Sequence, residues 1–335
     1  LNGVNICHET ISPIDGVVTI KIGDIINTSL NYLLPTNTTT KPIDSVTMTI
    51  DGVATVFQVI NGGVNTSTID VPTFLTYNFL TWQKQEQRSH VSSPRFLRYV
   101  AVDSCVIKAK VYYYVNDIIN TKEVDVISAT AGQDVMLNLS HAHMSFVPST
   151  IDKSSIAAMD VYVARGTQVL SYIQRYIFHS ENDPQRNTYV YLNSLGGWDS
   201  IELVGGITRI SEVESADFVN NDACSVLNVD ALNTYKKSSG YLIGADVRQL
   251  DEFLKSVKKY ESNDFGIREI IVTDKSTIED NKGNIVKCDF TYKFAKDSKY
   301  YNVERVALPF ELNFEFDGCS FSIAPRLSMY RHADI

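Results

Sequence analysis

Two histidines, His141 and His143, are separated by one residue, a spacing that can bring two imidazoles to one metal ion. On a β-strand both side chains would point to the same face, because side chains alternate between faces. Zinc sites use three or four protein ligands, and no third ligand is identifiable near this pair in the sequence. An exposed loop is the alternative, and we expect no bound metal here.

The sequence patterns of catalytic nucleophiles and nucleotide sites are absent. The chain has no G-x-S-x-G, no P-loop and no G-x-G-x-x-G. Carboxylates cluster at Glu212, Glu214 and Asp217, in what reads as a solvated turn, and Asp280 lacks the spacing of an EF-hand loop. We therefore expect a non-enzymatic protein without a cofactor. A polysaccharide depolymerase, which needs two carboxylates in one cleft, is the enzymatic alternative.

Aromatic residues at Trp82, at Trp198 and in the run 112–114 could stack on sugars or anchor a protein partner. In a β-rich chain such residues are more often core residues or cross-strand pairs. Trp198 follows Gly196 and Gly197, and paired glycines supply the positive φ of a tight turn. We expect these three residues to form a structural turn between two strands, with Trp198 covering it.

The segment from residue 76 to 99 is locally basic and lacks a clear period of two. One interpretation is a surface loop between strands. The other is an extended arm or long hairpin that reaches a neighbouring subunit. Positive charge on an acidic protein makes a self-complementary contact plausible. The second interpretation predicts an interface formed by Trp82, Arg88, Arg95 and Arg98.

The composition is that of a core-forming protein, with 335 residues of which 44% are hydrophobic and 21% charged. The formal net charge of -9 argues against nucleic-acid binding and against an anionic membrane surface, since both need a basic face. No apolar run approaches the roughly 20 residues that span a bilayer. The five cysteines are scattered without a C-x-x-C pair, and we expect them to be buried free thiols.

Residues 1–150 are expected to form one or more β-sandwich-like domains, with the long loop or arm at about 76–99. Asp51-Gly52 predicts a hairpin turn, and Asn116-Asp117 predicts a second turn. Strands are predicted over 17–22, 45–50, 53–60, 105–115 and 118–127.

Residues 151–335 are expected to form an α+β module that follows the polar, turn-rich stretch 148–155. One amphipathic helix is predicted over 246–260, with Asp246 as its N-cap. Its apolar stripe consists of Val247, Leu250, Leu254 and Val257. Strands are predicted over 160–163, 170–177, 188–193, 200–204, 267–273 and 285–294, and a hairpin over 306–323 that turns at Asp317-Gly318.

The stretch 189–202, YVYLNSLGGWDSIE, resembles a segment of phage and prophage tail-associated proteins from Bacteroidetes. That segment reads leucine-asparagine-x-leucine-glycine-glycine-aromatic-aspartate. The helix 249–260, the strand 267–276 and the hairpin segment 285–295 look like the same family's elements in the same order. The likeness covers roughly residues 155–300. It implies a virion tail or baseplate component that assembles as a ring or cap, and it implies no catalytic residues.

Together these observations predict a virion structural protein, a bacteriophage tail or baseplate subunit that acts through protein–protein interfaces. Its partners would be copies of itself, in a homo-oligomer, and other tail proteins. It would be located in the virion tail after assembly in the cytoplasm of the bacterial host. The alternative is a bacterial or phage surface adhesin that binds a host glycan or receptor, with Trp82 or residues 112–114 lining a groove.

Overall fold

The structure is a computed structural model that describes residues 26, 30, 33–63, 70–181, 183–220, 223–263, 266–279, 285–296, 313–316 and 319–322. The chain divides into two compact units, residues 1–297 and residues 298–335. In the second unit, β19 (Asn313–Phe316) and β20 (Cys319–Ser322) form an antiparallel hairpin inside the predicted range. The predicted turn at 317–318 and the predicted strand at 17–22 lie outside the described residues.

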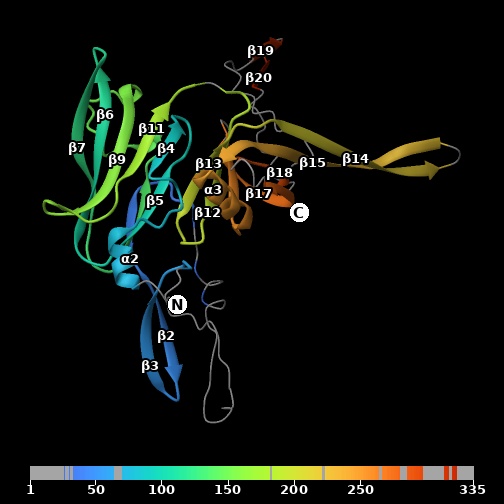
Figure 1. The fold of residues 1–335 in the computed structure, drawn as a ribbon. Helices are drawn as coiled ribbons and strands as arrows, with labels where there is room; N and C mark the ends of the chain where they lie inside the picture. The colour runs from blue at the N-terminus through green and yellow to red at the C-terminus, as the bar shows by residue number, and fades with distance from the viewer. Residues whose placement is uncertain are drawn as a thin grey trace. The chain divides into compact units, whose positions relative to one another are not determined.

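The first unit is mainly β, as the sequence predicts (Figure 1). One sheet has the order β4-β11-β9-β6-β7, with the short strand β10 paired to β9. Neighbouring strands within this sheet are antiparallel, except that β4 and β11 run parallel to each other. The strands are β4 (Glu86–His90), β6 (Cys105–Val115), β7 (Ile118–Ala129), β9 (Ile156–Arg165), β10 (Gln168–Val169) and β11 (Gln174–His179).

This sheet contains strands from both sides of residue 150. β6 pairs with β9, and β4 pairs with β11. A 3₁₀ turn, Lys153–Ser155, occupies the polar stretch where the domain boundary is predicted. The predicted division of the chain at residue 150 therefore does not coincide with a boundary between sheets.

A second, three-stranded sheet has the order β1-β8-β5, with β1 (Thr39–Pro42), β8 (Gln133–Asn138) and β5 (Phe96–Ala101). It shares one apolar core with the first sheet, which contains β4, β11, β9, β6 and β7. Alternate residues of β6 point into this core, and they are fully buried beside residues of β5 and β8: Ile107, Ala109, Val111, Leu97, Val135 and Leu137. Two sheets that pack over a common core make the sandwich-like arrangement predicted for this part of the chain.

Both predicted hairpin turns are confirmed. β2 (Asp44–Ile50) and β3 (Val53–Val59) form a two-stranded sheet that turns at Asp51-Gly52, where both residues have positive φ. β6 and β7 turn at Asn116-Asp117 with the same conformation. Positive φ at both central residues matches the right-handed twist of the flanking strands.

A seven-stranded sheet has the order β13-β12-β16-β17-β18-β15-β14. Every pair in it is antiparallel. The strands are β12 (Asn187–Leu192), β13 (Trp198–Leu203), β14 (Ile207–Asn220), β15 (Ala223–Ile243), β16 (Lys259–Asn263), β17 (Gly266–Glu279) and β18 (Ile285–Phe294).

The amphipathic helix is present as α3 (Ala245–Lys255), which is shorter than predicted. Gly244 occupies the N-cap position, so Asp246 lies in the first turn instead. The helix ends at Ser256, and Val257 lies beyond it with 86% of its surface exposed, outside the predicted apolar stripe. A shorter helix, α2 (Val71–Tyr77), was not predicted, and its N-cap Asp70 accepts a hydrogen bond from the Thr73 backbone N–H.

The core under α3 is aromatic. Phe253 of α3 contacts Tyr189, Tyr191 and Phe290, with ring centroids 5.3 to 5.7 Å apart. Tyr292 lies 5.9 Å from Tyr189 and extends the cluster across the sheet. Because each ring buries a large area and edge contacts between rings add to it, this cluster fixes the helix on the sheet.

The two edge strands of the seven-stranded sheet, β13 and β14, follow each other in the chain, and their connection runs beside β15. The Ser238 N–H donates to the Gly206 carbonyl at 3.0 Å. Lys237 is fully buried at this seam, where its ammonium donates to the Gln185 and Gly205 carbonyls and to Asn187 Oδ1. One buried cation therefore joins β15 to the start of β12 and to the connection between β13 and β14.

Burial at this seam lowers the pKa of Lys237 to about 8. Between pH 8 and about 10.4 the unfolded chain binds this proton more strongly than the folded one, so stability rises with pH in that window. Lys237→Met should remove this pH-dependent rise in the free energy of unfolding, which amounts to up to about 2–3 kcal/mol. Urea denaturation at pH 8, 9 and 10 measures it. The matched control is Lys236→Met, on the exposed face of β15, which should keep the wild-type rise; equal pH profiles for the two variants would contradict the assignment.

Candidate functional site

Arg95, predicted as an interface residue, is fully buried within the chain. Its guanidinium donates to Ser89 Oγ at 2.7 Å and to the Ser200 carbonyl at 3.0 Å, and it forms an ion pair with Glu202. Burial alone raises the pKa of the Glu202 carboxyl, but Arg95 and the His90 backbone N–H outweigh burial and hold that pKa below its ordinary value. Arg95 therefore joins β4 to β13, which belong to different sheets.

Arg98 is also buried, at 3% exposure, and it is paired inside the chain. Its Nε and Nη2 donate to the two carboxylate oxygens of Asp134 at 2.8 and 3.0 Å. Its Nη1 donates to the Gly196 carbonyl at 2.7 Å. Arg98 thus ties β5 and β8 of the three-stranded sheet to the glycine corner of the seven-stranded sheet.

The structure places Gly196, Gly197 and Trp198 at the corner between β12 and β13. Gly196 has a φ of 81°, and the Gly197 N–H donates to the side-chain oxygen of Asn193 at 2.9 Å. Trp198 is 1% exposed, and its indole N–H donates to the Leu33 carbonyl at 3.1 Å. The corner is therefore an interior joint rather than an exposed turn.

Asp199, next to this corner, is a fully buried carboxylate that was not predicted as a site residue. It accepts hydrogen bonds from Thr81 Oγ1 at 2.6 Å, the Trp82 backbone N–H at 3.0 Å and Gln83 Nε2 at 3.0 Å. Burial raises its pKa, and these donors oppose that rise. The carboxylate fixes the chain segment 81–83 against β13, so its role here is structural.

The loop or arm predicted at about 76–99 is corrected by these contacts. β4 and β5 occupy much of the segment, and several of its polar residues are buried: Gln83, Gln87, Ser89, Ser93, Arg95 and Arg98. The ion partners of Arg95 and Arg98, Glu202 and Asp134, are distant in the sequence, which is why the segment reads as surface there. Of the four predicted interface residues, Arg88 is exposed, with a 3.6 Å ion pair to Glu181.

Trp82, the remaining member of that set, is half-buried. Its indole N–H donates to Ser194 Oγ at 2.8 Å, and the Arg248 guanidinium lies 5.7 Å from its ring. The tyrosine run 112–114 divides between the two faces of β6. The Tyr112 hydroxyl donates to Asp160, Tyr113 packs against the core, and Tyr114 is exposed near the hairpin tip.

The largest feature missed in the sequence is the hairpin of β14 and β15. Glu212 and Glu214 lie on β14 rather than in a turn. β15 pairs with β18 only from Tyr235 to Ile243, so beyond Tyr235 the hairpin extends past the sheet as two strands (Figure 1). Both faces of β14 are exposed from residue 207 to 215.

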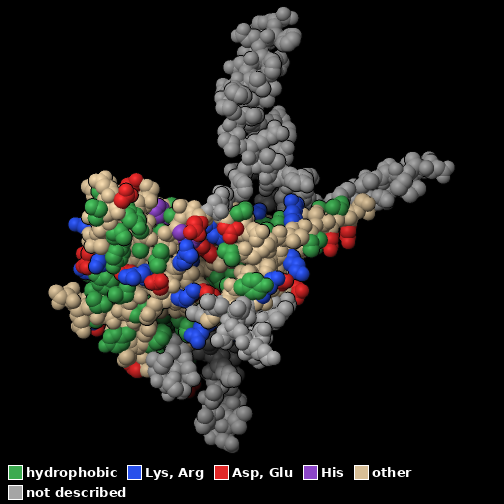
Figure 2. Space-filling view, turned by 45° about the horizontal axis from the view of Figure 1, so that its top comes forward, with side chains coloured by type: hydrophobic (Ala, Val, Ile, Leu, Met, Phe, Trp, Pro, Cys, Tyr) green, Lys and Arg blue, Asp and Glu red, His purple; other side chains and the backbone are tan. Residues whose placement is uncertain are grey.

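Hydrophobic and acidic side chains lie together on the described part of this hairpin (Figure 2). One face of β14 carries Ile210, Glu212 and Glu214, because alternate residues share a face. Leu232 of β15 is paired with Glu212 on the same face. We call these four exposed residues the acidic hairpin face.

Two other hairpins also expose large apolar residues. In the β2–β3 hairpin these are Ile50, Val53, Val56 and Phe57. At the tip of the β6–β7 hairpin they are Tyr114, Val115, Ile118 and Ile119. Exposed apolar patches of this kind mark contact sites in soluble proteins.

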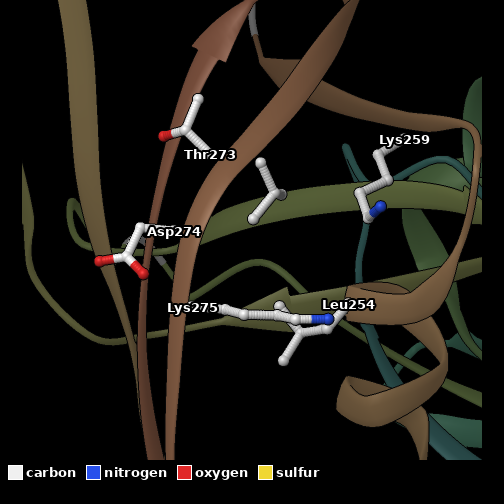
Figure 3. A pocket seen from close by; sticks show the side chains of 6 residues that line it. Leu254, Lys259, Thr273, Asp274 and Lys275 are labelled. Atoms are coloured by element: carbon white, nitrogen blue, oxygen red, sulfur yellow. The ribbon is translucent and has the colours of Figure 1, made fainter.

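An open hollow of about 220 Å³ lies between α3 and β17. Its lining residues are Leu254, Lys259, Val272, Thr273, Asp274 and Lys275, and we call it the lysine hollow. Figure 3 shows the Lys275 side chain extending toward Leu254, while the Asp274 carboxylate points away from the lysines. Burial and then the nearby Lys275 lower the pKa of Lys259.

His141 and His143 lie in a 3₁₀ turn rather than on a strand. His141 Nε2 is 2.7 Å from the Lys153 carbonyl oxygen, and its ring lies 5.7 Å from that of Phe178. In the part of the chain that the structure describes, no three potential ligands gather as a metal site would require. Cys105 and Cys288 are buried and form no disulfide, as predicted.

No helix in the described ranges combines the length and the apolar character needed to cross a membrane.

No protein-family model matches the chain, and no curated protein matches it. It has a partial likeness to a chain of the tail of an empty gene transfer agent particle with C6 symmetry, at 13% identity and a TM-score of 0.26, covering 35% of this chain and 96% of that one. A chain from the virion of a native gene transfer agent particle is similar at 14% identity and a TM-score of 0.23, covering 35% and 99%. At these TM-scores the likeness carries no argument about fold or function.

Proposed function

We propose that this protein is a non-enzymatic structural subunit of a bacteriophage tail or baseplate that acts through contacts with copies of itself and with other tail proteins. The β14–β15 hairpin is the observation that carries the proposal. Its strands leave the seven-stranded sheet and expose apolar side chains on both faces. A two-stranded hairpin is marginally stable alone in water, so a hairpin that extends this far past its sheet calls for a partner surface.

The interior charges support a structural role. Arg95 and Arg98 are each held by several partners that lock one sheet against another, and Asp199 holds the segment 81–83 against β13. Groups that are immobilised in this way stabilise the scaffold from which the hairpins extend. A rigid scaffold with extended hairpins suits a subunit that must dock repeatedly in one geometry, because preorganised contact surfaces lose less entropy on binding.

The proposal predicts that the purified protein self-associates and that the hairpin is needed for it. Ile210→Ser, Val213→Ser and Leu232→Ser together should lower the association constant at least 100-fold, since each exposed apolar side chain contributes on the order of 1 kcal/mol when a partner covers it. Sedimentation velocity over a wide concentration range, with negative-stain electron microscopy of the assembled state, measures this.

Val169→Ser, at an exposed apolar position on β10, is the matched control and should leave association unchanged. Circular dichroism should show the triple variant folded like the wild type, because its substituted side chains are exposed. A wild-type protein that stays monomeric at every concentration, and that does not join other tail proteins when they are added, would refute the proposed function.

A further inference from the structure

The acidic hairpin face and the lysine hollow have opposite charge. On β14, Glu212 and Glu214 are two residues apart, so their Cα atoms lie roughly 6.8 Å apart along the strand and their side chains leave the same face. Ile210 and Leu232 place apolar surface beside these carboxylates. The face therefore presents two negative charges on an apolar strip.

The lysine hollow has the complementary pattern. Leu254 and Val272 provide apolar lining, and Lys259 and Lys275 provide two ammonium groups. The carboxylate of Asp274, which also lines the hollow, points away from the lysines (Figure 3). The Lys259 ammonium donates to the backbone carbonyl of Ser256. The two lysines repel each other, as the lowered pKa of Lys259 reflects after the effect of burial. A carboxylate entering the hollow would relieve that repulsion.

The hairpin of the same molecule cannot reach the hollow without losing its own strand pairs. Glu212 is paired with Leu232, beyond the last contact of β15 with β18 at Tyr235. The hollow is formed by α3, β16 and β17, and β17 is separated from β15 by β18. A contact between the two surfaces is therefore intermolecular.

We propose that the lysine hollow of one subunit receives the acidic hairpin face of a second copy of this chain, with Glu212 and Glu214 paired to Lys259 and Lys275. This inference rests on the proposed function and specifies its self-contact. The two surfaces differ, so the contact is head-to-tail, and its repetition gives a closed ring or a filament. The pairing sets the register between neighbours, because like charges in the wrong register repel.

Charge reversal with rescue tests the pairing. Glu212→Lys, Glu214→Lys and Lys275→Glu should each weaken self-association at least about tenfold, because each places like charges together. Lys275→Glu should then be combined in one chain with Glu212→Lys or with Glu214→Lys. Association should be restored in the combination that reverses the glutamate facing Lys275. Mass photometry and sedimentation velocity at 50 mM and 500 mM NaCl measure the effect, which should shrink at high salt.

The matched control is Glu86→Lys, an exposed strand residue of β4. It should associate like the wild type. If all reversals associate like the control, or if no combination rescues Lys275→Glu, the hollow is not the docking site, whereas the proposed function still stands on the effect of the apolar hairpin substitutions. If the wild type neither associates with itself nor joins other tail proteins, the proposed function fails as well.

Discussion

Replacing Arg98 with methionine is expected to lower the free energy of unfolding by about 3–5 kcal/mol. Asp134, 3% exposed, would remain as a buried carboxylate without its bidentate partner, and the Gly196 carbonyl would lose its donor. Among the described residues, only the half-exposed Lys41, 3.8 Å away, would remain as an ion partner of Asp134. Leaving a buried charge with so weak a partner costs far more than an exposed ion pair contributes. Equilibrium urea denaturation, monitored by the fluorescence of Trp82 and Trp198, measures the loss.

Arg88→Met is the matched control, since it makes the same chemical change on a side chain that is 67% exposed. Its effect should stay within about 0.5 kcal/mol. The double variant Arg98→Met with Asp134→Leu should lose less than the sum of the single variants, because neither charge is then left alone. Equal losses for Arg98→Met and Arg88→Met would mean that the pair inside the chain does not stabilise the fold.

Local signals in the sequence predicted the local structure well. Asp51-Gly52 and Asn116-Asp117 are turn residues that tolerate positive φ, so the strand pairs around them could be recognised without any tertiary information. Leu250 and Leu254 marked the buried side of α3 without tertiary information as well, because residues four apart share one face of a helix.

The buried arginines could not be recognised in the same way. Arg95 and Arg98 flank Phe96 and Leu97 in a stretch without apolar-polar alternation, and their partners Glu202 and Asp134 are remote in the sequence. A charged residue whose partner lies far away in the sequence cannot be told from an exposed one by its neighbours alone. The parallel pairing of β4 with β11 has no local signal either, because its register depends on contacts across the predicted boundary at residue 150.

The β14–β15 hairpin was missed for the opposite reason. A strand that is exposed on both faces needs no alternation of apolar and polar residues, so Glu212 and Glu214 read as part of a solvated turn. The two faces of such a strand differ in burial only when a partner covers one of them. The signal that could have identified it is the β-branched content of 207–213, where isoleucine, threonine and valine are interspersed with charges.

Gly197→Ala is expected to destabilise the protein by about 2–4 kcal/mol, although it adds a single methyl group. A Cβ at Gly197 would lie 2.1 Å from the Leu80 carbonyl oxygen. That backbone cannot move aside easily, because the Leu80 N–H donates to the Arg98 carbonyl and the Leu80 carbonyl accepts from Asn193. Thermal and urea denaturation should both report the loss.

Gly206→Ala is the matched control, because a Cβ there meets no atom within 4 Å and its backbone does not adopt a positive φ. It should be neutral or stabilising by up to about 1 kcal/mol, since alanine reduces the entropy of the unfolded chain. In Gly197→Ala, backbone amides of residues 79–83 should be the first to lose protection from hydrogen exchange, because the Leu80 carbonyl contacts the corner. If both alanine variants behaved alike, the close approach of the corner to Leu80 would be wrong, and with it the claim that this corner joins the sheets.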